Sequence, residues 1–381
     1  MREPAVAIAG CGAVSAVGCG LEPLRNALRN NLRGLQASKK FGSPRFQSNV
    51  VGAAPRDIED ADPAWWLASE ALRQAVASVK DLNLPAQKTG LILSTTKANI
   101  EAFERISAGR SCPESARRHL QADLLAEDLA KEFRVHGPVQ AVSVACVSGL
   151  VALWQGVKLI QRGAADVVYV AGVDCLSEFV VAGFTALKAI DPQGCRPFDA
   201  ARCGLSPGEA GAAVVLARAD LVARPVITLR GFGGSNDANH LTGPSRDGSG
   251  LAQAIRTALA SAKLSPAEID FVHAHGTGTS YNDTMESLAL KTIFGETCPP
   301  VSGAKGMLGH TLGAAGVIET IICTLALQET FLPGTPGLVN PAEGTPKSLV
   351  RVARPAERLK HVLKLNTGFG GMNGALILSH E

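Results

Sequence analysis

Aromatic residues and strong net charge are both scarce in this sequence of 381 residues. Aromatic side chains make up 4% of it, and the formal net charge is only +3. A nucleic-acid-binding groove needs a basic surface and usually aromatic stacking partners, so we expect no nucleic acid as partner. Hydrophobic residues reach 46%, which is enough for a large buried core. The length predicts two domains or two fused halves.

Long hydrophobic runs and paired cysteines are also missing. No run of 18 apolar residues is free of glycine and charge, so we expect no membrane-spanning helix. The N-terminal MREPAVAIAGCGAVSAVG is broken by glycines and has no cleavage-site pattern of a secretory signal. The nine cysteines form no CxxC pair and no cluster with zinc-ligand spacing. These absences predict a cytoplasmic protein with reduced cysteines and no metal.

Several enzyme motifs are absent as well. The sequence has no GxxxxGK[ST] phosphate loop, no HExxH and no GxSxG. AGCGAVSAVG at 9–18 imitates a dinucleotide-binding turn, but Ser15 stands at the third glycine position. No acidic residue closes a second strand about twenty residues later, as that site requires. We interpret this turn as tight strand-to-helix packing, which disfavours a nicotinamide cofactor.

Short apolar runs alternate with helix-length segments along the whole chain. Strands are predicted at 5–10, 90–95, 141–145, 166–172, 212–218, 225–231, 270–276, 300–304, 361–366 and 374–379. Helices are predicted at 63–79, 120–133, 149–162, 250–262, 284–294 and 314–328. Buried strands that alternate with helices indicate an α/β fold.

The second half of the chain repeats the order of the first. VSGAK at 301–305 occupies the place that VSVAC has at 142–146. The spacing between corresponding strands is not constant, which fits an old duplication with different insertions. We predict the join near 219–225, which divides the chain into an N-terminal half, 1–222, and a C-terminal half, 223–381.

Cys146 is the first candidate for chemistry. In VSVACVSGLVALWQG, strand residues lead into Cys146, then a Ser-Gly turn and an apolar helix pattern follow. The unpaired N–H groups at the start of that helix would favour a thiolate. Taken alone, however, a small buried thiol is the better interpretation of Cys146.

Three glycine-rich stretches follow in the second half. His275 ends a predicted strand before GTGT, and Asn282 and Asp283 are expected to cap the next helix; a core histidine beside a flexible turn fits equally well. Lys305 and His310 precede a helix of small residues. If Lys305 is buried it needs an anion, and Glu319 is the nearest one; otherwise it faces solvent.

The third stretch is NTGFGGMNGALIL at 366–378, which places Phe369 among glycines. Its backbone could carry a gate or a ligand-facing loop, or form a simple hairpin turn.

The order of these motifs resembles the β-ketoacyl-acyl-carrier-protein synthases (ketosynthase II-like) of the thiolase-like superfamily. GCGAVSAVG, CRPFDAARCGLSPGEAGAAVVLAR (195–218) and GSNDANHLTGP (234–244) resemble further blocks of that family, so the likeness runs almost end to end. It implies a thiolase-like fold in which two duplicated βαβαβαββ halves form five layers, α-β-α-β-α.

The resemblance implies an acyltransferase. Cys146 would hold an acyl group as thioester, and malonyl-acyl carrier protein would condense with it in a decarboxylative Claisen reaction of fatty acid, polyene or polyketide elongation. His275 and His310 would stabilise the enolate, and Lys305 and Glu319 would be a buried pair that fixes the geometry. No permanent cofactor is implied, because the phosphopantetheine arm of acyl carrier protein delivers both substrates.

Further residues are assigned by the same resemblance. Thr277 and Thr279 would hydrogen-bond the phosphopantetheine arm, and Phe369 would gate the acyl pocket. Backbone N–H groups of Cys146 and Phe369 would form an oxyanion hole. Substrate contacts are also implied for Phe198, Gly370 and Asn373. Members of the superfamily pair through a strand near the nucleophile, which implies a homodimer or a heterodimer with a chain-length-factor subunit.

Some positions depart from the family pattern. Cys203, Leu205 and Met372 stand where Asp, an aromatic residue and Thr are common. STTKANIEAFERI at 94–106 replaces a Gly-rich stretch and introduces Lys97 and Glu101. This segment is closer to ketosynthases of specialised pathways such as aryl polyenes, so we expect an unusual acyl substrate.

Other functions remain possible for such a sequence. A non-catalytic chain-length-factor subunit generally lacks the nucleophilic cysteine, which argues against that alternative. A thiolase would use a late Cys in place of His310, and a starter-unit synthase would use Cys-His-Asn. A third alternative is a variant of the fold that only transfers or decarboxylates acyl groups.

Overall fold

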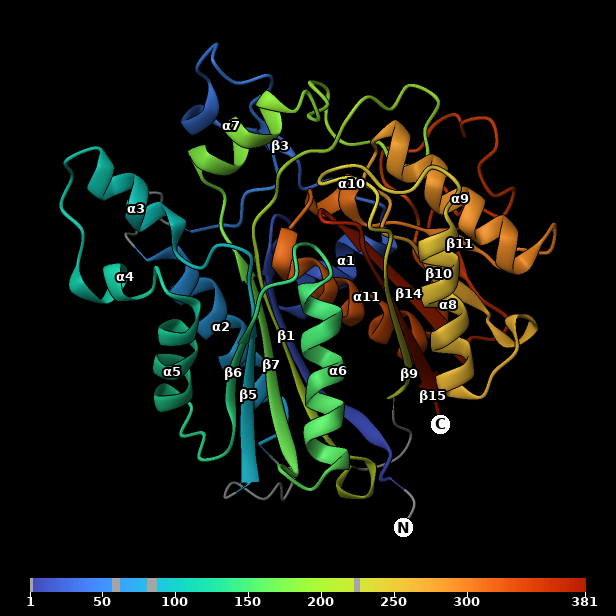
Figure 1. Ribbon diagram of the computed structural model, residues 1–381, viewed down its shortest axis with the longest axis horizontal. Helices are drawn as coiled ribbons and strands as arrows, with labels where there is room; N and C mark the ends of the chain where they lie inside the picture. Colours follow the sequence, from blue (N-terminus) through green and yellow to red (C-terminus); the bar gives the residue numbers. More distant parts are fainter. Residues whose placement is uncertain (1–2, 57–61, 81–87, 223–226) are drawn as a thin grey trace.

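The computed structural model describes residues 3–56, 62–80, 88–222 and 227–381 (Figure 1). Ten strands form the body of one mixed sheet: β1 (Val6–Ser15), β5 (Thr89–Ser94), β6 (Val139–Val142), β7 (Val167–Asp174), β8 (Ala210–Arg218), β9 (Ile227–Asn236), β10 (Phe271–His273), β11 (Val301–Ser302), β14 (His361–Gly368) and β15 (Met372–His380). The remaining strands are short: β2 (Gly18–Cys19), β3 (Gln36–Ala37), β4 (Val50–Val51), β12 (Phe331–Leu332) and β13 (Arg354–Pro355).

Most helices lie between these strands. They are α1 (Leu21–Arg29), α2 (Pro63–Ala77), α3 (Ile100–Ser107), α4 (Glu114–Arg118), α5 (Ala122–Glu132), α6 (Ser148–Gln161), α7 (Glu178–Ala186), α8 (Ser249–Ala262), α9 (Ser280–Phe294), α10 (Lys305–Leu308) and α11 (Ala315–Glu329). Each predicted helix overlaps one of them. The helices α1, α3, α4, α7 and α10 were not predicted.

The strand order confirms the duplication. The N-terminal half has the order β6-β5-β7-β8-β1, and the C-terminal half has β11-β10-β14-β15-β9. Counted along each half, both orders are 3-2-4-5-1. The pairings agree too, because the first three strands of each order are parallel and the remaining pairs are antiparallel. Each half therefore has the predicted βαβαβαββ plan.

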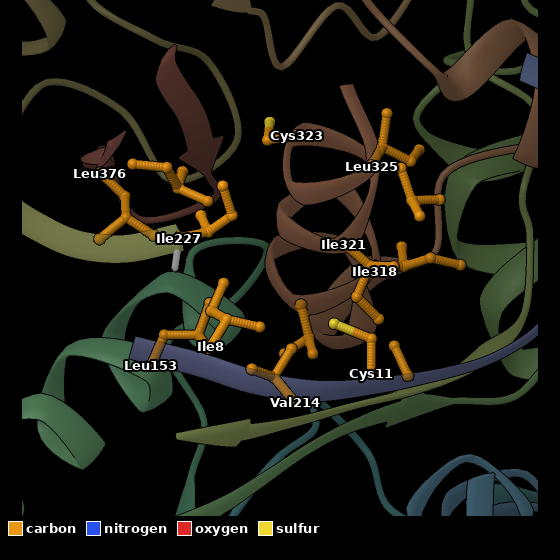
Figure 2. Packing of buried hydrophobic residues seen from close by; sticks show 14 of the residues in the cluster. Ile8, Cys11, Leu153, Val214, Ile227, Ile318, Ile321, Cys323, Leu325 and Leu376 are labelled. Atoms are coloured by element: carbon orange, nitrogen blue, oxygen red, sulfur yellow. The ribbon is translucent and has the colours of Figure 1, made fainter. Parts of the chain in front are cut away.

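The two halves stack around a central pair of helices. α6 and α11 contact each other, α6 contacts strands β5 and β7, and α11 contacts strands β14 and β15. Figure 2 shows Leu153 of α6 and Ile318 and Ile321 of α11 in one buried cluster with Ile8 of β1 and Leu376 of β15. α2 and α5 cover one outer face, and α8 and α9 cover the other. These are the five expected layers.

The two sheet layers are also joined edge to edge. Ala7 and Ile8 of β1 pair with Thr228 and Ile227 of β9, so hydrogen bonding continues from one half into the other. The boundary predicted between residues 222 and 223 adjoins 223–226, which lie outside the described residues, as do the first two residues of the strand predicted at 225–231. The division into 1–222 and 223–381 stays a prediction.

One segment, Leu312–Glu329, is long and apolar enough to cross a membrane by length and composition. However, 89% of this segment is buried inside the protein, because it contains α11, which lies between the two sheets. Gly313, Gly316 and Glu319 interrupt its apolar residues, so it is not an uninterrupted apolar run of the kind that the sequence analysis looked for. Its burial identifies it as a core helix.

Candidate active site

Cys146 lies in the turn between β6 and α6. The strand ends at Val142, earlier than the predicted 145, and Ala145 has a left-handed φ of 46°. Ser148 stabilises the turn: its Oγ accepts a hydrogen bond from the Val144 N–H at 2.7 Å and donates to the Ala145 carbonyl at 2.6 Å. A non-glycine residue with positive φ is strained, and such strain is common at functional sites.

Burial dominates the titration of this thiol. Cys146 is buried, and desolvation raises its pKa to about 11, although the charges of Lys305 and Lys97 act to lower it. Desolvation penalises the charged form of a buried acid, so the resting side chain is the neutral thiol. The expected stabilisation of a thiolate by the N-terminus of α6 stays a prediction.

His275 and His310 meet at Cys146. His275 follows β10 and His310 lies between α10 and α11, and their rings are perpendicular with centroids 5.2 Å apart. One side-chain atom from each of Cys146, His275 and His310 lies within 4.8 Å of the others. The fold thus unites residues from both halves that are up to 164 positions apart in the sequence (310 − 146).

The hydrogen bonds of both rings define their tautomers. Nδ1 of His275 contacts Lys305 Nζ and Asn366 Nδ2, each at 3.1 Å, and Nδ1 of His310 accepts from the Leu312 N–H at 3.1 Å. Ammonium, amide and backbone nitrogens are donors only, so each Nδ1 is an acceptor and the ring proton is on Nε2. Burial, then the Lys305 charge, holds the pKa of both imidazoles well below the usual range. Both rings are neutral Nε2–H donors.

Lys305 and Glu319 form the expected buried pair. The Lys305 ammonium donates to Glu319 Oε1 at 2.7 Å and to the His275 carbonyl at 2.5 Å. Burial by itself would raise the pKa of Glu319, but Lys305 and Lys364 outweigh it and lower this pKa to about 2. The carboxylate is therefore charged, and Lys305 reaches His275 from behind the ring.

Two members of this network were missed by the sequence analysis. Lys364 and Asn366 lie on β14, where Lys364 Nζ is 2.9 Å from Glu319 Oε2 and Asn366 Nδ2 is 3.4 Å from the same oxygen. The available signal was a lysine in the middle of the apolar run HVLKLN, because a lysine in a buried strand requires an anion.

The GTGT loop is held by carboxylates from the first turns of α9. Glu286 accepts from the backbone N–H groups of His275 at 2.5 Å and Gly276 at 2.9 Å, and Asp283 accepts from that of Thr277 at 3.0 Å. Burial raises the pKa of Glu286 to about 7. Asp283 was expected to cap α9, but Thr279 occupies the N-cap position and Asp283 lies within the helix and binds back to the loop.

A cavity of about 850 Å³ opens onto the three reactive residues. Thr277 and Thr279 line it and their Oγ1 atoms are 2.8 Å apart. Phe369 and Asn373 also line it, and the Phe369 side chain is 40% exposed near Phe184. The apolar wall comes from the α7 region: Phe179, Val180, Phe184, Leu187 and Ala189.

Phe198 and Gly370 differ from expectation. Neither is among the residues that line the cavity. Phe198 is fully buried in the cluster formed by α8, α9 and the outer face of the C-terminal half, so a substrate contact of Phe198 stays a prediction without support from this cavity. Gly370 lies at the turn between β14 and β15, where its N–H donates to the Leu241 carbonyl at 2.7 Å.

Some of the residues that depart from the family pattern line the cavity and others do not. Leu205 and Lys97 line it, whereas Cys203 is exposed and Glu101 is buried in ion pairs with Lys40 and Arg56. Met372 begins β15, and its sulfur contacts Asn236 Nδ2 at 3.0 Å. Lys97 is thus the new charge in the cavity wall.

The same three side chains have the donor types of a zinc site, but their surroundings oppose one. A histidine that binds a metal through Nε2 carries its proton on Nδ1 and donates it to an acceptor. In His275 and His310, Nδ1 instead faces the donors Lys305, Asn366 and Leu312. This arrangement suits rings that donate from Nε2.

Comparisons with known proteins identify the family. The N-terminal domain model of β-ketoacyl synthases matches residues 33–221, and the C-terminal domain model matches 226–338. A putative polyketide β-ketoacyl synthase 1 from Streptomyces halstedii is 32% identical over 98% of this chain and 97% of its own. The 3-oxoacyl-[acyl-carrier-protein] synthase 2 of Vibrio cholerae is 31% identical over 99% of both chains.

Solved structures give the same result. A chain of the ishigamide ketosynthase/chain length factor superposes with a TM-score of 0.91 at 29% identity over the full length of both chains. A ketosynthase in complex with its chain length factor from Xenorhabdus doucetiae gives 0.85 at 27% identity, over 99% and 98% of the two chains. The fold and the site define an acyl-transferring condensing enzyme of thiolase-like fold. The chain belongs to the β-ketoacyl synthase family.

Proposed function

We propose that this protein condenses malonyl-acyl carrier protein with an acyl group held on Cys146. The observation that carries the proposal is the meeting of a buried thiol and two neutral Nε2–H imidazoles within 4.8 Å at the cavity. A thiol can hold the acyl group, and two neutral donors stabilise a developing enolate without protonating it permanently.

The first step is acyl transfer. Cys146 Sγ attacks the acyl thioester, the bond to the phosphopantetheine sulfur breaks, and the proton of Cys146 leaves with the carrier thiol. The acyl transfer neither consumes nor releases a proton overall, which suits a thiol whose pKa is raised to about 11. The backbone N–H of Cys146 can assist, because it lies beside the end of β14; a Cβ on Gly368 would be 3.1 Å from that nitrogen. With the N–H of Phe369 it would form the oxyanion hole.

Decarboxylation and condensation follow. The bond between the malonyl methylene and its carboxylate breaks, CO2 leaves, and the electron pair remains as an enolate that accepts from His275 and His310. The enolate carbon then bonds to the acyl carbon, and the bond to Cys146 Sγ breaks. The released thiolate takes a proton from water. Lys305 and Glu319 act as positioning residues behind His275.

The phosphopantetheine arm would enter past Thr277 and Thr279, whose hydroxyls line the cavity. Phe369 would separate the acyl pocket from the malonyl site, and Asn373 would support that loop. Gly370 contributes backbone geometry at the turn. No permanent cofactor takes part, and we propose a cytoplasmic location, where acyl carrier proteins of this kind act.

Acylation of Cys146 tests the function directly. Labelled acyl carrier protein should transfer its label to the wild-type chain and to Cys19→Ala, which removes an exposed thiol. Cys146→Ala should take up no label in denaturing gel electrophoresis. Covalent label on Cys146→Ala would contradict the proposal.

Cys146→Gln separates the two half-reactions, because an amide imitates the acylated state. We expect it to release CO2 from malonyl-acyl carrier protein while forming no condensed product. His310→Ala should lose at least about 100-fold in CO2 release. Loss of CO2 release in Cys146→Gln together with full release in His310→Ala would rule out the two-histidine mechanism.

A ketosynthase-like partner is part of the proposal. The solved relatives named above include ketosynthases with a chain length factor. In this chain β6 ends the sheet, and Gln140 and Ala141 on it are exposed. We propose that a second copy or a chain-length-factor subunit pairs along this edge. The alternative, that this chain is itself the non-catalytic subunit, is disfavoured by the presence of Cys146, His275 and His310 together.

The acyl substrate is proposed to be conjugated, as in aryl polyene pathways. Lys97, from the unusual 94–106 segment, lines the cavity near Cys146, and its ammonium contacts Thr96 and Asp174. A cation in the wall favours a polarisable chain over a saturated one. Product analysis by mass spectrometry with purified carrier protein tests this; saturated long chains as the sole products would contradict it.

A further inference from the structure

Lys364 is a fully buried lysine that the mechanism above does not use. It lies in the middle of β14, in register with His273 of β10 and opposite Leu376 of β15. Its ammonium is 2.9 Å from Glu319 Oε2 and also donates to the Leu365 carbonyl. A buried ammonium is costly, and an apolar side chain in its place is often neutral or stabilising for the fold. Packing alone therefore does not account for it.

Lys364 changes the charge of the buried cluster. Lys305 binds Oε1 of Glu319 and Lys364 binds Oε2, so one carboxylate is held from both sides. The three groups sum to +1 (two ammonium groups and one carboxylate). Without Lys364, Lys305 and Glu319 would form a pair with no net charge. The cluster lies directly behind His275, because Lys305 Nζ is 3.1 Å from its Nδ1.

The titratable groups around Lys364 come from three neighbouring elements. They are Glu319 and Cys323 of α11, Lys305 of α10, and His273 and His275 at β10 and just after it. Glu319 is the one acidic residue among them. Added positive charge disfavours protonation of a neighbouring imidazole, and it favours a negative charge that develops on the far side of that ring.

We propose that Lys364 is a positioning residue for the condensation: it clamps Glu319 against Lys305 and, through that pair, keeps His275 in its neutral, donating form. The inference rests on the proposed function. The clamp orients Lys305 toward His275 Nδ1, so the ring proton stays on Nε2. The net positive charge stabilises the enolate at a distance without contact with substrate.

The matched variants are Lys364→Met, which removes the charge but keeps most of the aliphatic stem, and Lys364→Arg, which keeps the charge. Lys360→Met is the control, because Lys360 is exposed and immediately precedes β14. Circular dichroism with thermal melting verifies that each variant is folded.

Two readouts are measured on each variant. The first is the titration of His275 in ¹⁵N-histidine NMR spectra, and the second is kcat and KM for malonyl-acyl carrier protein across pH. In Lys364→Met the titration of His275 should move to higher pH, and the acidic side of the pH profile of kcat should move with it. The maximal kcat should fall about 10- to 100-fold, and KM should change less. Lys364→Arg should retain the wild-type titration, and Lys360→Met should behave as wild type.

The NMR titration keeps this inference separate from the proposed function. A wild-type chain without condensing activity would refute the function, while the titration still reports on Lys364. A Lys364→Met variant with wild-type titration and kcat would overturn the inference. Equal losses of kcat in Lys364→Met and Lys364→Arg with unchanged titration would assign Lys364 to packing and overturn it too.

Chemical rescue gives a second route if Lys364→Met does not fold. Lys364→Ala leaves a hole beside Glu319, and methylammonium supplied in solution should restore kcat in a saturable manner. Ethanol, which is similar in size but uncharged, should not. Rescue by ethanol to the same level, or no rescue by either, would contradict a role for the charge.

Discussion

The thiol of Cys146 is protonated in the resting site because it is buried beside two neutral imidazoles. Its pKa of about 11 means that the thiolate fraction rises with pH throughout the range in which the protein is handled. We expect the rate of alkylation by iodoacetamide at Cys146 to increase about tenfold per pH unit from pH 7 to 9. Peptide mass spectrometry measures the rate, with exposed Cys19 as internal reference. A plateau below pH 8 would show that the thiolate is stabilised instead.

Asp174 is a second residue whose role is readable from its contacts. It is fully buried and accepts hydrogen bonds from the N–H groups of Thr96 at 3.0 Å and Gly313 at 2.7 Å. It therefore ties the turn that carries Lys97 to the segment next to Leu312, whose N–H holds His310.

Asp174→Asn should weaken this tie, because an amide nitrogen would face N–H donors. We expect a loss of about 1–3 kcal/mol in the free energy of unfolding and a fall in kcat as His310 loosens. Urea denaturation and steady-state kinetics measure both. Asp123→Asn, at an exposed site on α5 that does not line the cavity, serves as control; equal effects in the two variants would refute the interpretation.

At the scale of elements, the site depends on how closely α6 approaches α11. Gly149 of α6 and Gly316 of α11 face each other, and a Cβ on Gly316 would lie 2.5 Å from the Leu150 backbone nitrogen. Because the obstacle is backbone, it can move only if the helices separate, and Cys146 and Glu319 would move with them.

Gly316→Ala should therefore lower the free energy of unfolding by about 1–3 kcal/mol or more and reduce condensation. Gly183→Ala is the matched control, since Gly183 is also helical and a Cβ there meets nothing within 4 Å. That change should be neutral or stabilising by about 0.5–1 kcal/mol. Thermal melts compare the two, and equal melting temperatures would contradict the close-packing argument.

At the scale of the whole molecule, β6 is the outermost strand of the sheet among the described residues, and we have proposed that a second chain pairs along it. The Pro138 carbonyl accepts from the Leu91 N–H of β5 at 2.9 Å, and the Val142 carbonyl accepts from the Thr95 N–H, directly after β5, at 3.1 Å. The backbone groups of Ala141 therefore point to the opposite side. An edge of this kind is a template for pairing with another chain.

Ala141→Pro removes the outward N–H without removing a bond to β5. We expect sedimentation velocity to show a dimer, alone or with a partner subunit, for the wild type and a large shift to monomer for Ala141→Pro. Ala141→Val, which keeps the N–H, should remain dimeric. A fully dimeric Ala141→Pro variant would place the interface elsewhere.

Local sequence patterns were sufficient to predict the strands and helices that repeat in the two halves. Runs such as DVVYVAG and AAVVLAR are short, apolar and bounded by turns, and they became β7 and β8. α7 was missed because EFVVAGFTA mixes valines with glycine and has weak helical periodicity. Its signal was Ser177, whose Oγ accepts from the Val180 N–H at 3.2 Å as an N-cap.

Periodicity in the sequence was sufficient to predict the α/β class and the repeated halves, whereas Cys146, His275, Lys305, His310 and Glu319 were singled out by the order of short motifs that resembles a known family. The chemical state of these residues follows only from the folded structure. The raised pKa of Cys146, the Nε2–H tautomers of both histidines and the recruitment of Lys364 all depend on burial and on partners distant in sequence. Desolvation and hydrogen bonding act through space, so no local pattern of residues encodes them.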